Sequence, residues 1–328
     1  MEAFMAWLKS VNDVVWGPGM LVLLVGTGLY LTVGLKFFTF RNFFRGLKNL
    51  WAGRSNQSEQ GEISPFNALM TALAADIGTG NIVGVSTAIY IGGPGALFWM
   101  WVTALVGMMT KFSEVLLSVH FREKTPAGNW VGGAMYFIKN GLGKSYTWLA
   151  TSFALFGMIA CFGIGAMVQA NAISVNLAKT VSVPEWGTAL ALLFFAGIVL
   201  IGGVKRVGAV AGKLVPFMAV LYIIMCLVII FMNIHRVPSV FWWVVSDAFT
   251  PTAAQGGFVG ASVMMAIRMG MARGVFSNEA GLGSAPIAHA ATSEKNPVRQ
   301  GLYGIFEVFM DTIVICTLTA MVILCSGT

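Results

Sequence analysis

The stretch AADIGTGN, residues 74–81, interrupts a long apolar run and determines how the rest of the chain is interpreted. Asp76 is the only charged residue between Ile63 and Thr110, and the apolar chain around it is long enough to cross a bilayer twice, at about 20 residues per crossing. Glycine has little conformational preference, so the glycines of this stretch favour an unwound backbone. Unwound backbone is tolerated at membrane depth only where it lines a buried or water-filled cavity. The sequence therefore predicts a broken helix whose ends form a binding site for an ion or a small substrate.

The composition is that of a helical integral membrane protein. Of the 328 residues, 57% are hydrophobic and 10% are charged, and the mean hydropathy is +0.80. A soluble domain has about 25% charged residues. The formal net charge of +7 does not indicate nucleic-acid binding, because the basic residues fall in short segments between apolar runs. We therefore expect an all-α membrane protein whose partner is the lipid bilayer, with no nucleic acid.

The apolar runs predict about eight transmembrane spans, two of them discontinuous. A polar loop is expected over 36–64, a second over 120–147 and a third over 203–213. The segment 235–255, with Trp242 and Trp243, is typical of an interfacial helix or loop. The predicted spans are 14–35, 66–90 (broken), 96–119, 148–178 (strongly tilted), 186–204, 214–234, 256–291 (broken) and 301–325.

The distribution of lysine and arginine predicts the orientation in the membrane. Fourteen of these residues lie in the segments 36–65, 120–147, 203–213 and 291–300, which the predicted spans place on one side. The opposite side has three: Lys9, Lys179 and Arg236. Because basic loops remain in the cytoplasm, we expect a multi-pass plasma-membrane (inner-membrane) protein with its N-terminus outside.

A second interruption lies in the seventh predicted span. Arg268 and Arg273 precede it, Glu279 lies within it, and the break is expected over 273–281. Charged residues at membrane depth cost roughly 2.5–3.5 kcal/mol each, so they need partners or water. The two broken spans lie five spans apart and enter the membrane from opposite sides, as an inverted repeat of five helices requires.

Two motifs resemble a known family. The run GGPGALFWMWVTALVG, residues 92–107, is similar to the signature of the alanine/glycine:cation symporters, and FSNEAG, residues 276–281, is equally characteristic of them. The resemblance covers essentially the whole chain. It implies sodium-coupled symport of small neutral amino acids, alanine or glycine, by alternating access, with sodium as the coupling ion and no other cofactor.

The same resemblance implies a LeuT-like fold with two inverted five-helix repeats and one extra N-terminal helix. Residues 1–328 would form a single transmembrane domain. In it, 14–35 is the extra helix, 66–234 the first repeat and 256–325 an incomplete second repeat.

The family pattern implies roles for the substrate-binding residues. The backbone amides of Thr79 and Gly80 would hold the substrate carboxylate at the helix break, where the helix dipole favours an anion. A second set would close over the small side chain and bind the amine, and it consists of Phe276, Ser277 and Asn278. Gln169 is a candidate for the polar wall of the substrate site. Alternatively, it only forms a hydrogen bond between helices.

The pattern also implies a sodium site at the first break. Backbone carbonyls near Ala74 and Ile77 and the side-chain oxygen of Asn81 would supply the oxygen ligands that a hard cation requires. Asp76, included among the substrate-binding candidates, would either ligate a cation or pair with Arg268 or Arg273, and the residue pattern does not separate these possibilities.

Other functions fit the sequence less well. The three helices that would complete the second repeat are not in the chain, so a truncated, transport-inactive relative is the alternative hypothesis. The spans contain neither a nucleophile–base pair nor a His/Cys/Asp metal set, so the protein is not expected to be an enzyme. Gly80 and Gly84 could form only a small-residue packing face, an interpretation that the second break and the signature disfavour.

Overall fold

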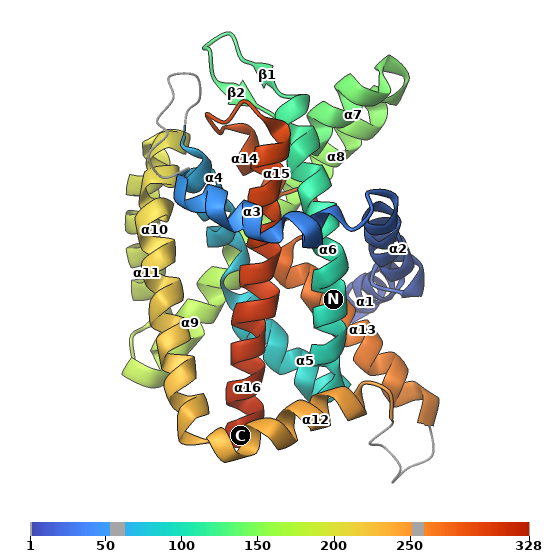
Figure 1. The fold of residues 1–328 in the computed structure, drawn as a ribbon. Helices are drawn as coiled ribbons and strands as arrows, with labels where there is room; N and C mark the ends of the chain where they lie inside the picture. Colours follow the sequence, from blue (N-terminus) through green and yellow to red (C-terminus); the bar gives the residue numbers. More distant parts are fainter. Residues whose placement is uncertain (1, 53–62, 251–258, 328) are drawn as a thin grey trace.

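The computed structural model describes residues 2–52, 63–250 and 259–327. Their regular secondary structure is helical, apart from a two-stranded antiparallel hairpin of β1 (Glu123–Lys124) and β2 (Trp130–Val131) (Figure 1). Among these residues, five helices are long and apolar enough to cross a membrane, and a bent helix pair raises the number to six. The prediction of an all-α, multi-pass membrane protein is therefore confirmed. The count of eight spans remains a prediction.

The N-terminal region forms three helices: α1 (Glu2–Val15), α2 (Pro18–Gly34) and α3 (Phe38–Ala52). The loop predicted for 36–64 is wrong in its first part, which α3 occupies; residues 53–62 lie outside the described residues. Apolar side chains recur along α3 at helical spacing and pack into the core, whereas the basic residues between them face outward. Figure 1 shows α3 lying across the bundle, where it contacts α15 (Pro297–Val308).

The helix break predicted at residues 74–81 is present. Helix α4 (Pro65–Asp76) begins after Ser64, whose hydroxyl accepts a hydrogen bond from Asn67 N at 3.1 Å and caps the helix. The chain then resumes as a π-helical turn, η1 (Gly80–Gly84), followed by α5 (Val85–Gly92). The second half is bent by 47° from α4, so the span is discontinuous where the glycines allow it.

Helix α6 (Gly95–His120) is the central helix of the bundle and packs most extensively against α13 (Val259–Asn278) and α15. Its start is fixed by α12 (Val237–Asp247), because Asp247 Oδ2 accepts a hydrogen bond from Gly95 N at 2.9 Å. A Cβ on Gly95 would lie 2.5 Å from Ala248 N, so only glycine allows this approach.

The hairpin leads into α7 (Ala134–Leu142), η2 (Lys144–Tyr146) and a helix of span length that runs from η2 to the end of α9. That helix consists of α8 (Thr147–Ala160), the π-helical η3 (Cys161–Met167) and α9 (Val168–Val181). Helix α10 (Glu185–Ile201) and helix α11 (Gly203–Met232) lie side by side in Figure 1. The loop predicted over 203–213 is wrong, because these residues form the first turns of α11.

A short turn, η4 (Ile234–Arg236), leads from α11 into α12, which runs crosswise to α11 at the lower end of the bundle in Figure 1. Large apolar side chains on α8 to α11 are exposed, in keeping with contact to lipid.

The second break begins later than predicted. Residues 273–278 continue α13, and the chain leaves the helix at Glu279 (φ 53°), Gly281 (φ 92°) and Gly283 (φ 76°) before α14 (Ala285–Ala290). Residues 256–258 of the predicted seventh span lie outside the described residues. The last span is continuous and comprises α15, the π-helical η5 (Phe309–Cys316) and α16 (Thr317–Ser326). The inverted-repeat relationship remains a prediction.

Candidate functional site

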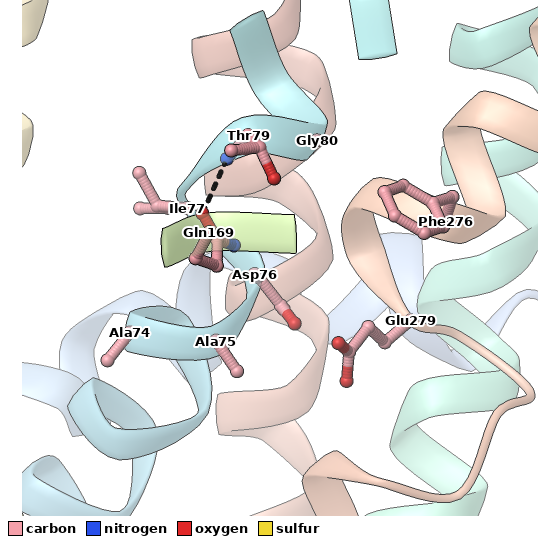
Figure 2. A pocket seen from close by; sticks show the side chains of 9 residues that line it. All are labelled: Ala74, Ala75, Asp76, Ile77, Thr79, Gly80, Gln169, Phe276 and Glu279. Atoms are coloured by element: carbon pink, nitrogen blue, oxygen red, sulfur yellow. Dashed lines mark hydrogen bonds between the residues drawn. The ribbon is translucent and has the colours of Figure 1, made fainter. Parts of the chain in front are cut away.

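A cavity of about 140 Å³ lies where the two broken helices meet. It is bounded by the end of α4 and the start of η1 on one side, by α9 on another, and by the end of α13 opposite (Figure 2). Its lining residues are Ala74, Ala75, Asp76, Ile77, Thr79, Gly80, Gln169, Phe276 and Glu279. Both helix breaks therefore open onto one shared cavity.

Side chains cap the backbone amides exposed by the first break. Thr79 N donates a hydrogen bond to Gln169 Oε1 at 3.2 Å, and Gly78 N donates one to Asn81 Oδ1 at 2.8 Å. A Cβ on Gly78 would lie 2.7 Å from Gln169 Nε2, so glycine allows the Gln169 side chain to cover the break. The Thr79 amide, predicted to hold a substrate carboxylate, is thus bonded in this structure to the predicted polar wall.

Seven of the predicted site residues line the cavity: Ala74, Asp76, Ile77, Thr79, Gly80, Gln169 and Phe276. The other three, Asn81, Ser277 and Asn278, are fully buried behind it. Of Phe276, Ser277 and Asn278, only Phe276 lines the cavity in this structure, and the expectation that the three close together over a ligand stays a prediction. Helical periodicity turns the next two residues of α13 toward η5 instead.

The three residues behind the cavity belong to a polar cluster centred on Asp311. Its Oδ1 accepts hydrogen bonds from Asn81 Nδ2 at 2.6 Å and from Ser277 Oγ at 3.0 Å. Its Oδ2 accepts the hydroxyl of Thr312 at 2.7 Å, and Thr312 Oγ1 in turn accepts Asn278 Nδ2 at 3.0 Å. Most of the atoms in this cluster that could ligate a cation are carboxylate and hydroxyl oxygens, which suit a hard cation. Asp311 is not among the site residues predicted from the sequence, because its partner Asn81 lies 230 residues away along the chain.

A second buried network starts at the cavity floor. Lys111 Nζ lies 3.9 Å from Asp76 Oδ2 and 2.8 Å from Glu307 Oε1, and Glu307 Oε2 lies 2.9 Å from His289 Nε2. His289 Nδ1 is 2.7 Å from Gln300 Nε2. All five side chains of this network are buried. Both carboxylate oxygens of Glu307 are thus paired within the bundle.

The suggested partners of Asp76 are wrong. Arg268 pairs instead with Asp13, at 2.9 Å, and the guanidinium of Arg273 lies 5.9 Å from the centre of the Phe276 ring. The charge nearest to Asp76 is Lys111, which helix α6 places beneath the break. The sequence contained no local signal for this contact, because the two residues lie on different helices.

Arg122, just beyond the end of α6, holds the segment that follows α14 in place through hydrogen bonds. Its guanidinium donates to the backbone oxygens of Ala290, Thr292 and Glu294 at 2.7–3.0 Å and lies 4.2 Å from the centre of the Trp130 ring. Burial lowers the pKa of Arg122, and the Glu294 carboxylate partly offsets this effect. The same segment reaches α4 through a parallel β-bridge between Ile63 and Thr292. The upper ends of the two broken helices in Figure 1 are therefore held together.

Comparison with known proteins gives a consistent picture. A family model described as the sodium:alanine symporter family matches residues 1–328. The chain is 46% identical over 329 residues to the sodium/alanine symporter AgcS of Methanococcus maripaludis, an alignment that covers 99% of this chain and 71% of that protein. It is 49% identical over 321 residues to an uncharacterized transporter of Haemophilus influenzae, covering 98% and 70% of the two chains. It is 39% identical over 315 residues to the probable sodium/glutamine symporter GlnT of Bacillus subtilis, covering 96% and 64%.

Proposed function

Because this chain belongs to the sodium:alanine symporter family, we propose that it couples the sodium gradient to the uptake of a small neutral amino acid, alanine or glycine. It is a multi-pass membrane transporter and not an enzyme. The main support for the proposal is the cavity shared by the two helix breaks, because a substrate can contact both broken spans there at once. A transport-inactive relative is not favoured, since relatives are named as symporters and carriers.

The size of the cavity supports a small substrate. An engineered apolar cavity of about 150 Å³ holds benzene, a ligand of six heavy atoms. The cavity here is about 140 Å³, and alanine also has six heavy atoms while glycine has five. Glutamine, with ten, would require the cavity walls to move apart. Size therefore favours alanine or glycine over the substrate named for GlnT.

The first break supplies the carboxylate site in this proposal. Thr79 and Gly80 lie at the beginning of η1, where backbone N–H groups and the helix dipole favour an anion. The Gln169 side chain now accepts the Thr79 N–H and would turn its amide toward the incoming carboxylate. Phe276 forms the apolar wall for the substrate side chain.

Sodium, the second transported species, fits the adjacent oxygen cluster. The side-chain oxygens of Ser277 and Asp311 lie together behind the break, and Asn81 contacts Asp311 through Nδ2 while its Oδ1 accepts Gly78 N. Backbone carbonyls near Ala74 and Ile77 lie at the end of α4. Asp311 supplies the negative charge that a monovalent cation requires. Binding of sodium and substrate on two sides of one broken helix would couple their movements within a LeuT-like, alternating-access carrier whose N-terminus lies outside.

Proteoliposome uptake tests the proposal. The full-length protein, reconstituted with an inward sodium gradient, should concentrate radiolabelled alanine and should stop doing so when choline replaces sodium. Gln169→Leu should weaken alanine affinity about tenfold, because a hydrogen bond to a charged ligand is lost. Asn176→Leu is the control on the same helix, where the exposed amide donates a hydrogen bond to Ala172 O within its own helix. Sodium-independent uptake, or equal affinity in both variants, would contradict the assignment.

A further inference from the structure

A second and larger cavity, of about 360 Å³, lies between α3, α4, α11 and the last span. Every residue that lines it is apolar, and each of these helices contributes, with Leu50 from α3, Leu73 from α4, Ala219 from α11 and Phe306 from α15. Val220, another lining residue, is 56% exposed, so the cavity opens onto the outer surface of the bundle. The exposed side chains of α11 are also largely apolar, as expected of a surface that faces the hydrocarbon of the bilayer.

The size and lining of this apolar cavity select a long apolar occupant. Its volume is more than twice the roughly 150 Å³ of an engineered apolar cavity that holds benzene. The lining residues of α11 run from Val215 to Ile223, which is about 12 Å along the helix axis at about 1.5 Å per residue. The cavity therefore suits a hydrocarbon chain better than a compact polar metabolite.

The end of the apolar cavity near the start of α11 is rich in positive charge. Lys213 lies one helical turn before Pro216, which lines the cavity, and Lys48 lies two residues before Leu50. Leu50 and Val215 belong to one apolar cluster, so α3 and the first turns of α11 meet at this end. Both lysines are exposed, and neither forms an ion pair with another described residue. Helices α3 and α11 together contain six basic residues and no acidic one.

We propose that the apolar cavity binds one acyl chain of an anionic phospholipid whose phosphate lies near Lys48 and Lys213. Lysine side chains bury their methylene stems along apolar surface and place the ammonium group at the headgroup level, where anionic lipids attract it. Helix α3 crosses the bundle in Figure 1 and has an apolar face and a basic face, which is typical of a helix in the bilayer interface. A neutral lipid would leave the lysines without a counter-charge, and a soluble anion would find no polar partner in the lining. An anionic phospholipid matches both features.

The proposed lipid site adjoins the first helix break. Ile77 lines both the apolar cavity and the substrate cavity, and Leu73, one turn earlier in α4, lines the apolar one. An acyl chain in the apolar cavity would therefore pack against the end of α4, directly before the backbone leaves the helix. Binding of the lipid requires neither sodium nor an amino acid, so this inference stands apart from the proposed transport function.

Native mass spectrometry of the purified full-length protein measures lipid binding directly. After delipidation, the protein should retain one molecule of phosphatidylglycerol at concentrations at which phosphatidylcholine with the same acyl chains is not retained. Lys48→Gln/Lys213→Gln should weaken phosphatidylglycerol binding roughly 25-fold, about fivefold for each lysine near an anionic headgroup. Lys9→Gln/Lys179→Gln makes the same change in charge at exposed positions in α1 and α9 and should leave this binding unchanged.

Filling the apolar cavity tests the acyl-chain part of the proposal. Ala219→Phe places a ring in the cavity and should prevent retention of phosphatidylglycerol, whereas Ala191→Phe, at an exposed position of α10, should not. Size-exclusion chromatography checks that both variants remain folded. Equal retention of the two lipids by the unmodified protein, or retention of neither, would overturn the inference, and this comparison needs no variant. Unchanged phosphatidylglycerol binding in folded Ala219→Phe, or in the Lys48→Gln/Lys213→Gln variant, would overturn it as well.

Discussion

Lys111 offers the most direct test of the buried charge network, through the substitution Lys111→Met. The ammonium group is fully buried, 2.8 Å from Glu307 Oε1 and 3.9 Å from Asp76 Oδ2. Methionine retains most of the side-chain volume and removes the charge. The substitution therefore leaves Glu307 with His289 as its remaining charged partner and removes the ammonium group that pairs with Asp76.

The expected loss of stability is large for a single residue. Breaking one partner of a buried ion pair costs about 3–5 kcal/mol, because the remaining charge stays buried without compensation. For a chain of this size, about 2 °C of melting temperature corresponds to each kcal/mol, so we expect a fall of about 6–10 °C. The exposed pair of Lys139 and Glu123, with side chains 50% and 39% exposed, is the matched comparison. Removing it should cost at most about 1 kcal/mol.

Thermal unfolding of the purified protein in detergent, followed by size-exclusion chromatography, measures both effects. Lys111→Met should lower the midpoint several times more than Lys139→Met. The double variant Lys111→Met/Glu307→Met should recover part of the loss, because one unpaired carboxylate has been removed with its partner. If Lys111→Met melts no earlier than Lys139→Met, the ammonium group does not stabilise the buried carboxylates and our interpretation of the network is wrong.

Three further predictions concern the helices and connecting segments around the site. Gly95→Ala should destabilise the protein by about 1–3 kcal/mol, because its Cβ would lie 2.5 Å from Ala248 N, whereas Gly19→Ala, with open space around it, should have no such effect on the melting temperature. Arg122→Met should speed hydrogen exchange over 290–296 by removing three hydrogen bonds to that segment, and equal protection in both proteins would show that the guanidinium does not hold it. In a Cys161→Ala background, Thr125→Cys should resist an impermeant thiol reagent on intact cells while Ser182→Cys reacts, and the reverse pattern would invert the proposed orientation.

Local sequence was sufficient for features that depend on local chemistry. The glycines and the polar residues at 74–81 predicted a helix break, and α4 ends there, because glycine allows the backbone to leave the helix wherever it stands. The amphipathic α3 could also have been found from its spacing of apolar residues, but its basic side chains led us to predict a loop. The second break was predicted too early for a similar reason. The prediction followed the charged residues of this region, whereas the helix ends where the backbone becomes left-handed, at Glu279.

Tertiary structure alone decided which polar residues meet. Asn81 and Asp311 are 230 residues apart, and Lys111 and Glu307 are 196 apart, yet each pair is in hydrogen-bond contact. Periodicity could place each of these side chains on an interior face, but the partner depends on how whole helices pack against one another. For the same reason, Asp76 was given the wrong cationic partners, and the sequence did not show that Ser277 and Asn278 form hydrogen bonds with η5. In this protein, local sequence therefore determines where helices form and break. Which residues meet in the binding site depends on how helices distant in the sequence pack together.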